Sequence, residues 1–298
     1  MSRSWLRRLV LVALAGVVAS VPPASAARAS KPAAIVIQKV DEAKFEPAPG
    51  EPFFLLLLGN DGRAGVSGQR GDGIHLVGVN PSAGTATILN IPRDTWADVP
   101  GRGYGKINSA FQFGGLRLQA ETVGRLVGVP VTFGITTDFD GFQGLVEDMG
   151  GLEVNVPFDM NDRNSGAVYP AGPIHMDAHY ALAFARNRYI PGGDLARTEH
   201  QGILLQTALT KVRAETNGPL DTMRMVAILA RHTSLHDVSL ADLYTLARYA
   251  TGLPAEGIRN ITMPSTITTI GRASVVLPGP GSAELFADFA DDAVLQAH

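Results

Sequence analysis

The sequence has no cysteine among its 298 residues. Disulfide bonds, cysteine-ligated zinc or iron–sulfur sites and cysteine nucleophiles are therefore excluded. The chain also lacks a G-x-x-x-x-G-K-[ST] phosphate loop and a G-x-S-x-G elbow, so P-loop nucleotide hydrolysis and serine-hydrolase chemistry have no support. His175 and His179 are four residues apart without an H-E-x-x-H motif, and we expect them to be structural. Only 18% of the residues are charged and 45% are hydrophobic, which indicates a globular protein with a large core.

Lysine is also scarce, because five of the 25 basic residues are lysine and the rest are arginine. GC-rich coding would produce such a bias, and so would a site that binds anions through the planar guanidinium fork. Several arginines fall on predicted helix faces, where we expect them to be solvated. Six others lie in or beside loops that also carry aspartate, and their position favours an anion site.

The first 26 residues have the features of a secretory signal peptide. An arginine-rich start precedes an apolar stretch from Leu9 to Val21, and Ala24-Ser25-Ala26 forms a small-residue cleavage signal. The apolar stretch is shorter than the ~20 residues that a spanning helix needs, so a retained N-terminal membrane anchor is the less favoured alternative. We therefore expect an exported protein. All charged residues in the segment that cleavage would remove are basic, so the mature chain would be more acidic. A net negative charge disfavours nucleic-acid binding.

A proline-rich linker is predicted at residues 27–51, followed by one α/β domain at residues 52–290. The run from Phe53 to Leu58 is apolar on both faces and predicts a buried central strand. The alternation of strands and helices favours a single domain with a central mixed β-sheet and helices on both faces. Further strands are predicted at residues 73–79, 85–91, 131–136 and 152–156, and helices at 116–127, 139–149, 177–186 and 198–213.

The first of three charged clusters follows the opening strand and carries Asp61, Arg63, Arg70 and Asp72. Loops at strand ends are where α/β folds build their sites. Pairing of the flanking strands would bring Asp61 and Asp72 together as carboxylates for a hard cation such as Mg²⁺. Alternatively, both aspartates simply form turns beside glycine.

The second cluster is Arg93-Asp94, which follows Pro92 at the end of the third strand. An ordinary surface ion pair is the alternative reading of these two residues.

The third cluster begins with Arg186 and Arg188 at a helix end, where cations also meet the helix dipole favourably. Asp194 is predicted as the N-cap of the next helix, and Arg197 and Gln201 share one face of that helix. Six arginines in three loops repel one another unless a multiply anionic group lies among them. A diphosphate fits this requirement, because guanidinium groups bind its oxygens in pairs.

In order and spacing, these segments resemble the LytR-CpsA-Psr family of glycopolymer ligases from bacterial cell envelopes. The likeness extends over about residues 52–290, and the order of its short motifs is hard to obtain by chance. The motifs are Asp61-x-Arg63, Arg70-x-Asp72, Ile91-Pro92-Arg93-Asp94-Thr95, Lys106-Ile107-Asn108, Gly114-Gly115, Asp148-x-Gly150-Gly151, residues 181–188 and Asp194-x-x-Arg197-x-x-x-Gln201.

The resemblance implies an enzyme that transfers a glycopolymer from a polyprenyl diphosphate carrier to peptidoglycan, forming a phosphodiester and releasing polyprenyl phosphate. It implies Mg²⁺ as cofactor, with Asp61 and Asp72 as the metal-contacting carboxylates and with Asp94 and Asp194 orienting the arginines. Asp72 is also a candidate to accept the proton of the attacking hydroxyl. The residues around the diphosphate would be Arg63, Arg70, Arg93, Arg186, Arg188, Arg197 and Gln201; Arg93, Arg186 and Arg188 among them would stabilise the reacting charge.

The family fold also implies an apolar tunnel for the lipid tail, and a location at the outer face of the membrane or in the cell wall. Two features depart from the family. Gly71 and Gly73 flank Asp72 where the family often has hydroxyl residues, and a cleavage site stands where members usually keep an anchor. Hydrolysis of a polyprenyl diphosphate and noncatalytic binding of polyprenyl phosphate lipids are the alternative functions. Candidate tunnel residues are Leu118, Val123, Phe133, Ile135, Phe142, Leu145 and Val146.

Overall fold

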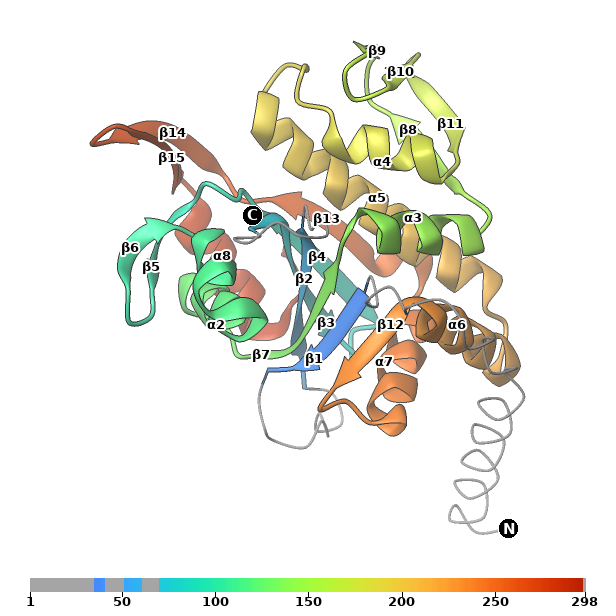
Figure 1. The fold of residues 1–298 in the computed structure, drawn as a ribbon. Coiled ribbons are helices and arrows are strands. Elements are labelled where there is room, and N and C mark those ends of the chain that lie inside the picture. The colour runs from blue at the N-terminus through green and yellow to red at the C-terminus, as the bar shows by residue number, and fades with distance from the viewer. Residues whose placement is uncertain (1–34, 41–50, 61–69, 297–298) are drawn as a thin grey trace, which may run out of the picture. The chain divides into compact units, whose positions relative to one another are not determined.

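The computed structural model describes residues 35–40, 51–60 and 70–296, which belong to one compact unit. Its centre is a seven-stranded mixed sheet in the order β12-β1-β7-β2-β3-β4-β13 (Figure 1). Pairs β1–β12, β2–β7 and β4–β13 are parallel, and the other three are antiparallel. The strands are β1 (Ile35–Lys39), β2 (Phe53–Asn60), β3 (Gly71–Asn80), β4 (Thr85–Ile91), β7 (Val131–Thr137), β12 (Thr233–His236) and β13 (Ile258–Thr262).

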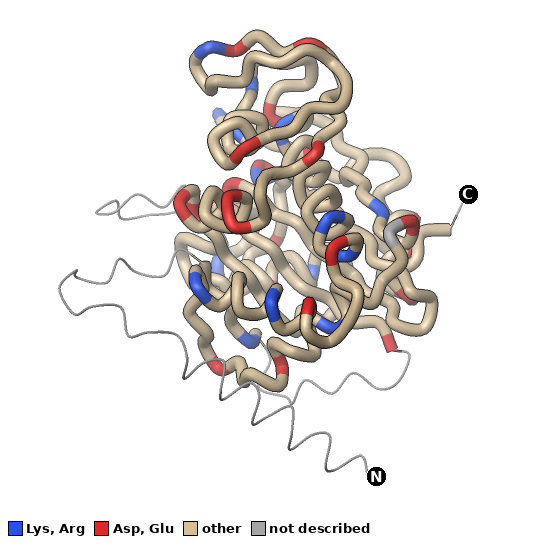
Figure 2. Tube along the Cα trace, turned by 90° about the vertical axis from the view of Figure 1, so that its right-hand side faces the viewer, with Lys and Arg blue, Asp and Glu red and all other residues tan. Residues whose placement is uncertain are grey.

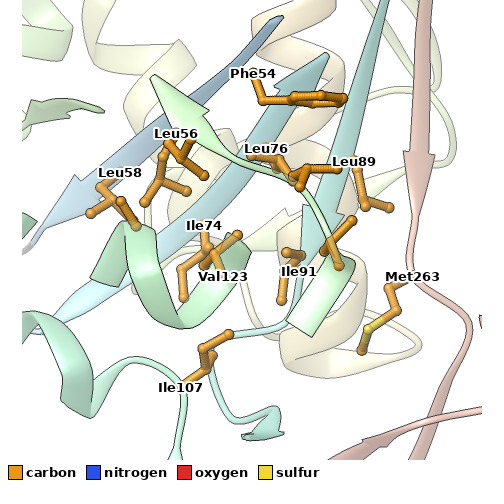
Figure 3. Packing of buried hydrophobic residues seen from close by; sticks show 14 of the residues in the cluster. Phe54, Leu56, Leu58, Ile74, Leu76, Leu89, Ile91, Ile107, Val123 and Met263 are labelled. Carbon is orange, nitrogen blue, oxygen red and sulfur yellow. The ribbon is translucent and has the colours of Figure 1, made fainter. Parts of the chain in front are cut away.

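Strand β2 shows how the sequence produces two covered faces. Side chains alternate across a strand, so Phe54, Leu56 and Leu58 point to one side and Phe53, Leu55 and Leu57 to the other. The first set packs with helices α2 (Ser109–Val127) and α8 (Ser282–Asp292). Figure 3 shows Leu56 and Leu58 in this cluster together with Ile74 on β3 and Val123 on α2. The second set packs with α5 (Gly193–Glu215) and α7 (Leu240–Gly252).

The predicted mixed sheet with helices on both faces is thus confirmed. Helices α3 (Phe139–Asp148) and α6 (Pro219–His232) complete the α5 side, where Leu145 and Val226 pack with Ile35 and Ile37 of β1. A smaller layer above α5 contains α4 and four short strands around a separate apolar cluster (Figure 1). Its elements are β8 (Leu152–Val156), β9 (Met160–Asp162), β10 (Ala167–Tyr169), β11 (Gly172–Met176) and α4 (Ala178–Arg186).

Two hairpins extend from the α2 side of the domain (Figure 1). Strands β5 (Trp96–Val99) and β6 (Gly103–Lys106) follow β4, and β14 (Ser265–Ile270) and β15 (Ala273–Pro278) follow β13. A short 3-10 helix, Ala255–Gly257, precedes β13. The β5–β6 hairpin connects the segment that contains Arg93 to α2, so it determines the position at which α2 begins.

One stretch of the predicted linker is instead part of the sheet. Residues Ile35–Lys39 form β1, with Ile35 and Ile37 buried between β7 and β12. A five-residue strand among proline and alanine gives little periodic signal, and its partners lie far along the chain. The predicted signal peptide at residues 1–26 lies outside the described residues, and the boundaries of the 52–290 domain stay predictions.

Two helices begin earlier than predicted. Helix α2 starts at Ser109 rather than Leu116, and it bends at Gly114 and Gly115, where the φ angle of Gly115 is 62°. Only glycine adopts this left-handed conformation readily, which is why the helix pattern breaks there. Helix α5 starts at Gly193 rather than Thr198.

Candidate anion-binding site

The register of the central sheet places Asp72 beside Arg93. Antiparallel pairing of β3 and β4 sets Ile74 opposite Ile91, so Asp72, two residues before Ile74, meets Arg93, two residues after Ile91. Arg93 Nη1 donates to Asp72 Oδ1 at 2.6 Å. The predicted neighbours Asp61 and Arg63 lie outside the described residues; strand β2 ends just before them, with Asn60 opposite Gly71.

Asp194 joins three arginines from separate segments. Its carboxylate lies 3.2 Å from Arg93 Nε, 3.4 Å from Arg188 Nε and 3.0 Å from Arg197 Nε. The predicted N-cap role of Asp194 is wrong, because Gly192 is the N-cap and Asp194 lies within the first turn of α5. Its carboxylate therefore does not cap the helix and instead contacts the three arginines. We call Asp72, Arg93, Arg188, Asp194 and Arg197 the arginine cluster.

Arg197 is the most deeply buried member of the arginine cluster, with 3% of the residue exposed. Its Nη2 also donates to the backbone oxygen of Asp72 at 3.0 Å, which ties α5 to the start of β3. Burial lowers the pKa of Arg197, and the charge of Asp194 opposes this shift. For Arg93, burial also lowers the pKa, but the hydrogen bond to Asp72 and the nearby carboxylates outweigh it and the net shift is upward. Both guanidinium groups stay charged.

The arginine cluster therefore holds three positive and two negative charges. Basic and acidic positions are otherwise interspersed along the described chain (Figure 2), so the excess is local. An excess of guanidinium groups converging on one place can accept a doubly or multiply charged anion, with planar N–H pairs matched to phosphate oxygens.

Asp94 and Lys106 form a separate pair beside the arginine cluster. Lys106 Nζ lies 3.0 Å from Asp94 Oδ2, so the carboxylate predicted to orient arginines has Lys106 as its ion-pair partner. The backbone fixes this arrangement, because Asn108 N donates to Arg93 O at 3.2 Å and Ile107 N donates to Thr95 O at 2.7 Å. The motif Lys106-Ile107-Asn108 carried no predicted role for Lys106, and the pairing of β5 with β6 is what brings this lysine to Asp94.

Three predicted diphosphate residues make no ion pair within the arginine cluster. Arg70 Nε donates to Gln112 Oε1 at 3.4 Å, and exposed Arg186 lies over the Phe139 ring with its Cζ 5.0 Å from the centroid. Gln201 Nε2 donates to Ala185 O at 3.0 Å. Arg70 and Arg186 each lie two residues from a member of the arginine cluster, so they border it in sequence.

The predicted tunnel residues do not identify a tunnel. Val123, Phe133 and Val146 are fully buried in three different apolar clusters, and Ile135 and Leu145 pack in a fourth. They are core residues, and the tunnel itself stays a prediction. A cavity of about 450 Å³ between α2 and the start of β7 has a mixed lining that includes Arg117, Glu121 and Val129, and no residue of the arginine cluster borders it.

Sequence reasoning missed a row of buried and half-buried polar side chains near the arginine cluster. His75 Nδ1 and Asn90 Oδ1 are 2.7 Å apart, and Asn90 Nδ2 donates to Asn260 Oδ1 at 2.7 Å and to Thr262 Oγ1 at 3.2 Å. We call His75, Asn90, Asn260 and Thr262 the polar layer. It joins β3, β4 and β13 on the side covered by α5. Polar residues inside apolar strands were the signal available in the sequence, at His75 and Asn90 in particular.

Helix α5 can approach the polar layer because residue 202 is glycine. A Cβ at this position would overlap the carboxamides of Asn90 and Asn260. Gly202→Ala is therefore expected to lower the free energy of unfolding by about 2 kcal/mol: overpacking costs up to ~3 kcal/mol, and replacing a helical glycine by alanine returns ~1 kcal/mol. Urea unfolding followed by circular dichroism measures the difference.

The matched control is Gly252→Ala, at the end of α7, where an added Cβ meets nothing within 4 Å. This substitution is expected to leave stability unchanged or to raise it slightly. Equal stability of the two variants would show that α5 is not in close contact with the polar layer.

Comparisons with known proteins agree with this fold. The model of the LytR_cpsA_psr family matches residues 20–283. The chain is 35% identical over 163 residues to the polyisoprenyl-teichoic acid–peptidoglycan teichoic acid transferase TagU of Bacillus cereus, covering 54% of this chain and 53% of TagU. It is 33% identical over 178 residues to the corresponding transferase TagV of Bacillus subtilis, covering 56% and 45%. The chain thus spans about half the length of the curated relatives it matches.

Solved structures show the same fold over most of the chain. The crystal structure of B. subtilis TagV superposes with a TM-score of 0.68 at 24% identity, covering 82% of this chain and 97% of TagV. TagT bound to LI-WTA gives 0.68 at 23% identity, covering 85% and 94%. A structure of YwtF (TagT) with bound octaprenyl pyrophosphate lipid gives 0.63 at 22% identity, covering 86% and 95%.

Proposed function

The chain belongs to the LytR_cpsA_psr family, and we propose that it transfers a glycopolymer from a polyprenyl diphosphate carrier to peptidoglycan. Its relatives in Bacillus are named as transferases of teichoic acid from a polyisoprenyl carrier to peptidoglycan. One related fold binds octaprenyl pyrophosphate. For the present chain we propose only the class of each substrate: a glycopolymer on a polyprenyl diphosphate as donor, and peptidoglycan as acceptor.

The observation that carries the proposal is the excess positive charge of the arginine cluster. Arg93, Arg188 and Arg197 meet around one carboxylate, and the guanidinium of Arg197 is buried. A buried guanidinium is retained only where charge partners repay its desolvation. The carboxylates of Asp72 and Asp194 offset part of this desolvation free energy, and a diphosphate beside Arg93 and Arg188 would offset the rest.

The proposed reaction is phosphoryl transfer. A hydroxyl oxygen of the acceptor attacks the sugar-bearing phosphorus, the bond from this phosphorus to the bridging oxygen breaks, and polyprenyl phosphate leaves with the electron pair. The hydroxyl proton passes to a carboxylate of the site, for which Asp72 is the proposed acceptor. Negative charge grows on the leaving phosphate, and guanidinium groups held in place by Asp72 and Asp194 would stabilise that charge with little reorganisation.

We further propose Mg²⁺ as cofactor, with Asp72 and Asp61 as carboxylate ligands. In the described part of the chain, no three His, Asp or Glu side chains are grouped to hold a metal. Mg²⁺ is usually held by one or two carboxylates together with substrate phosphates and water, so Asp72 fits such a site. The ion would neutralise charge on the diphosphate oxygens.

The test incubates the purified protein with a polyprenyl diphosphate-linked sugar, Mg²⁺ and peptidoglycan fragments. Sugar linked to peptidoglycan through a phosphodiester is the expected product. Free sugar phosphate alone would indicate hydrolysis instead, and binding without turnover would indicate a lipid carrier. A parallel reaction with EDTA tests the proposed ion, since transfer should slow and recover on adding Mg²⁺.

A transferase acting on peptidoglycan works outside the cytoplasmic membrane, so we propose that the protein is exported and acts close to the membrane that carries its lipid substrate. Within the described residues, none of the helices combines the length and apolar composition needed to cross a bilayer. Fractionation of cells, with N-terminal sequencing of the mature chain, tests both export and the predicted cleavage after Ala26.

A further inference from the structure

Asn187 lies between two arginines of the predicted diphosphate site, and its side chain is buried. The residue is 0% exposed, whereas Arg186 and Arg188 on either side are exposed. Asn187 has extended backbone angles, with φ −63° and ψ 124°, and side chains alternate across an extended segment. Its carboxamide therefore points into the protein. A polar group in this position needs hydrogen-bond partners, because leaving them out costs free energy.

The carboxamide of Asn187 closes a turn around Arg188. Asn187 Oδ1 accepts a hydrogen bond from Tyr189 N at 3.0 Å. The backbone N–H can only donate, so the oxygen of the carboxamide must be the atom that faces it. A bond of this kind, to the backbone two residues later, forms an Asx turn, and Arg188 is its central residue. Asn187 Nδ2 donates to Met160 Sδ on β9 at 3.5 Å, which ties the turn to the layer that contains α4.

The segments before and after this turn are also bonded to fixed parts of the fold. Asn187 is the C-cap of α4, and Gln201 Nε2 on α5 donates to Ala185 O in the last turn of α4 at 3.0 Å. Beyond the turn, Gly192 and Gly193 have φ angles of 89° and 56°, which reverse the chain into α5. Both ends of the loop are thus in place, and the Asx turn determines the direction of the chain between them.

Arg188 depends on its backbone more than the other two arginines of the arginine cluster do. Its Nε lies 3.4 Å from the Asp194 carboxylate, compared with 3.2 Å for Arg93 and 3.0 Å for Arg197. Its side chain is also the most exposed of the three, at 48%. An exposed ion pair at this distance holds a long side chain only weakly. The position of the Arg188 guanidinium therefore follows from where the turn places its Cα.

We propose that Asn187 is a positioning residue that holds Arg188 where its guanidinium binds the diphosphate. Without the Asx turn, the backbone at Arg188 adopts further conformations, and the anion must order this segment when it binds. Affinity is lost by that ordering, although no contact to the anion has been removed. The inference rests on the proposed function for the identity of the anion.

Two substitutions at position 187 differ by a single oxygen atom. Asn187→Ser and Asn187→Ala both shorten the side chain and lose the contact with Met160. The serine hydroxyl still accepts from the backbone two residues later, as it does in other turns, and alanine has no acceptor. We expect N187A to bind geranylgeranyl diphosphate about fivefold more weakly than N187S, as measured by calorimetry in the presence of Mg²⁺.

Asn187→Leu keeps the experiment decisive if the smaller side chains fail to fold. Leucine has the branched shape of asparagine and packs on Met160, but it offers no acceptor to Tyr189 N. It should therefore bind the diphosphate as weakly as N187A while melting at a higher temperature than N187A. A residue that serves stability alone would not separate these two quantities.

Arg188 and a second asparagine provide the controls. In proteins that also carry Arg188→Ala, the difference between N187S and N187A should vanish, because Asn187 acts through Arg188. Asn80→Ala is the matched control: Asn80 is also buried, and its Oδ1 accepts from Ser82 N at 3.0 Å in the turn at the opposite end of β3 from Asp72. This variant should melt at a lower temperature and bind the diphosphate with unchanged affinity.

Equal affinities of N187S and N187A, a difference that persists without Arg188, or weaker binding by Asn80→Ala would each overturn the inference. Hydrogen exchange at Tyr189 N gives a readout without any lipid, and it should be slow in the unaltered protein and N187S but faster in N187A. Fast exchange in the unaltered protein would show that the turn is not formed. If the unaltered protein binds no diphosphate, the proposed function fails as well, whereas normal binding with equal affinities of the variants removes only the role of Asn187.

Discussion

Replacing Arg93 by alanine should lower kcat/KM for glycopolymer transfer by about 100- to 1,000-fold, which corresponds to about 3–4 kcal/mol of transition-state stabilisation. Arg93 is the arginine that contacts both carboxylates of the arginine cluster, at 2.6 Å from Asp72 and 3.2 Å from Asp194. Its removal leaves two positive charges against two negative ones, so the site loses the excess positive charge that we propose attracts the diphosphate. The transfer assay with purified protein measures the effect.

Two further variants make the Arg93 result specific. Arg93→Lys keeps the charge but not the planar fork, and it should recover only part of the lost rate. Arg125→Ala removes an exposed arginine on α2 that pairs with Glu121, and it should transfer at the rate of the unaltered protein. A rate for Arg93→Ala within about threefold of the unaltered protein would remove this guanidinium from the mechanism.

Asp194→Ala should destabilise the protein by about 3 kcal/mol. Asp194 contacts three arginines, and the side chain of one of them, Arg197, is only 4% exposed. Removing one partner of a buried ion pair costs ~3–5 kcal/mol because the other charge stays buried, and the partial exposure of Asp194 places the effect at the lower end. Thermal and denaturant unfolding measure the loss.

Asp194→Asn is the informative companion, since it keeps the shape and one acceptor oxygen while removing the charge. We expect it to be destabilised by less than the alanine variant. Lys211→Ala, which breaks an ordinary pair with Glu215 in the last turn of α5, should cost at most ~0.5 kcal/mol. If Asp194→Ala were as stable as Lys211→Ala, the arginine cluster would not depend on Asp194.

The sequence predicted the sheet and much of the site, because both follow from strong local signals. The run from Phe53 to Leu58 is six residues long, apolar throughout and followed by Gly59, and this combination favours a buried strand over a helix. Once β3 and β4 pair as neighbours, Asp72 and Arg93 must meet at their common end. Motif order then identified the loop that brings Arg188, Asp194 and Arg197 to the same place.

What the sequence could not provide depends on contacts between distant segments. The N-cap preference of aspartate is a local tendency, and for Asp194 the charge of three arginines outweighed it. The partner of Asp94 depends on where the β5–β6 hairpin returns Lys106. The polar layer requires a histidine inside a strand, and it requires glycine at positions 73 and 202, because a Cβ at either position would crowd its side chains. None of these has a periodic or motif signature, so sequence reasoning passed over them.

The position of β1 bears on how the chain acquires its structure. This strand is near the beginning of the chain, yet one of its two edges is bonded to β12, where Ile35 lies opposite Thr233. Ribosomal synthesis delivers the amino end first, so that edge stays open until most of the remaining sequence has been made. Pairings between such remote segments form slowly, because a long loop must close first. Unfinished chains would therefore present an open sheet edge to one another, and a chaperone that prevents their association would have to cover this edge.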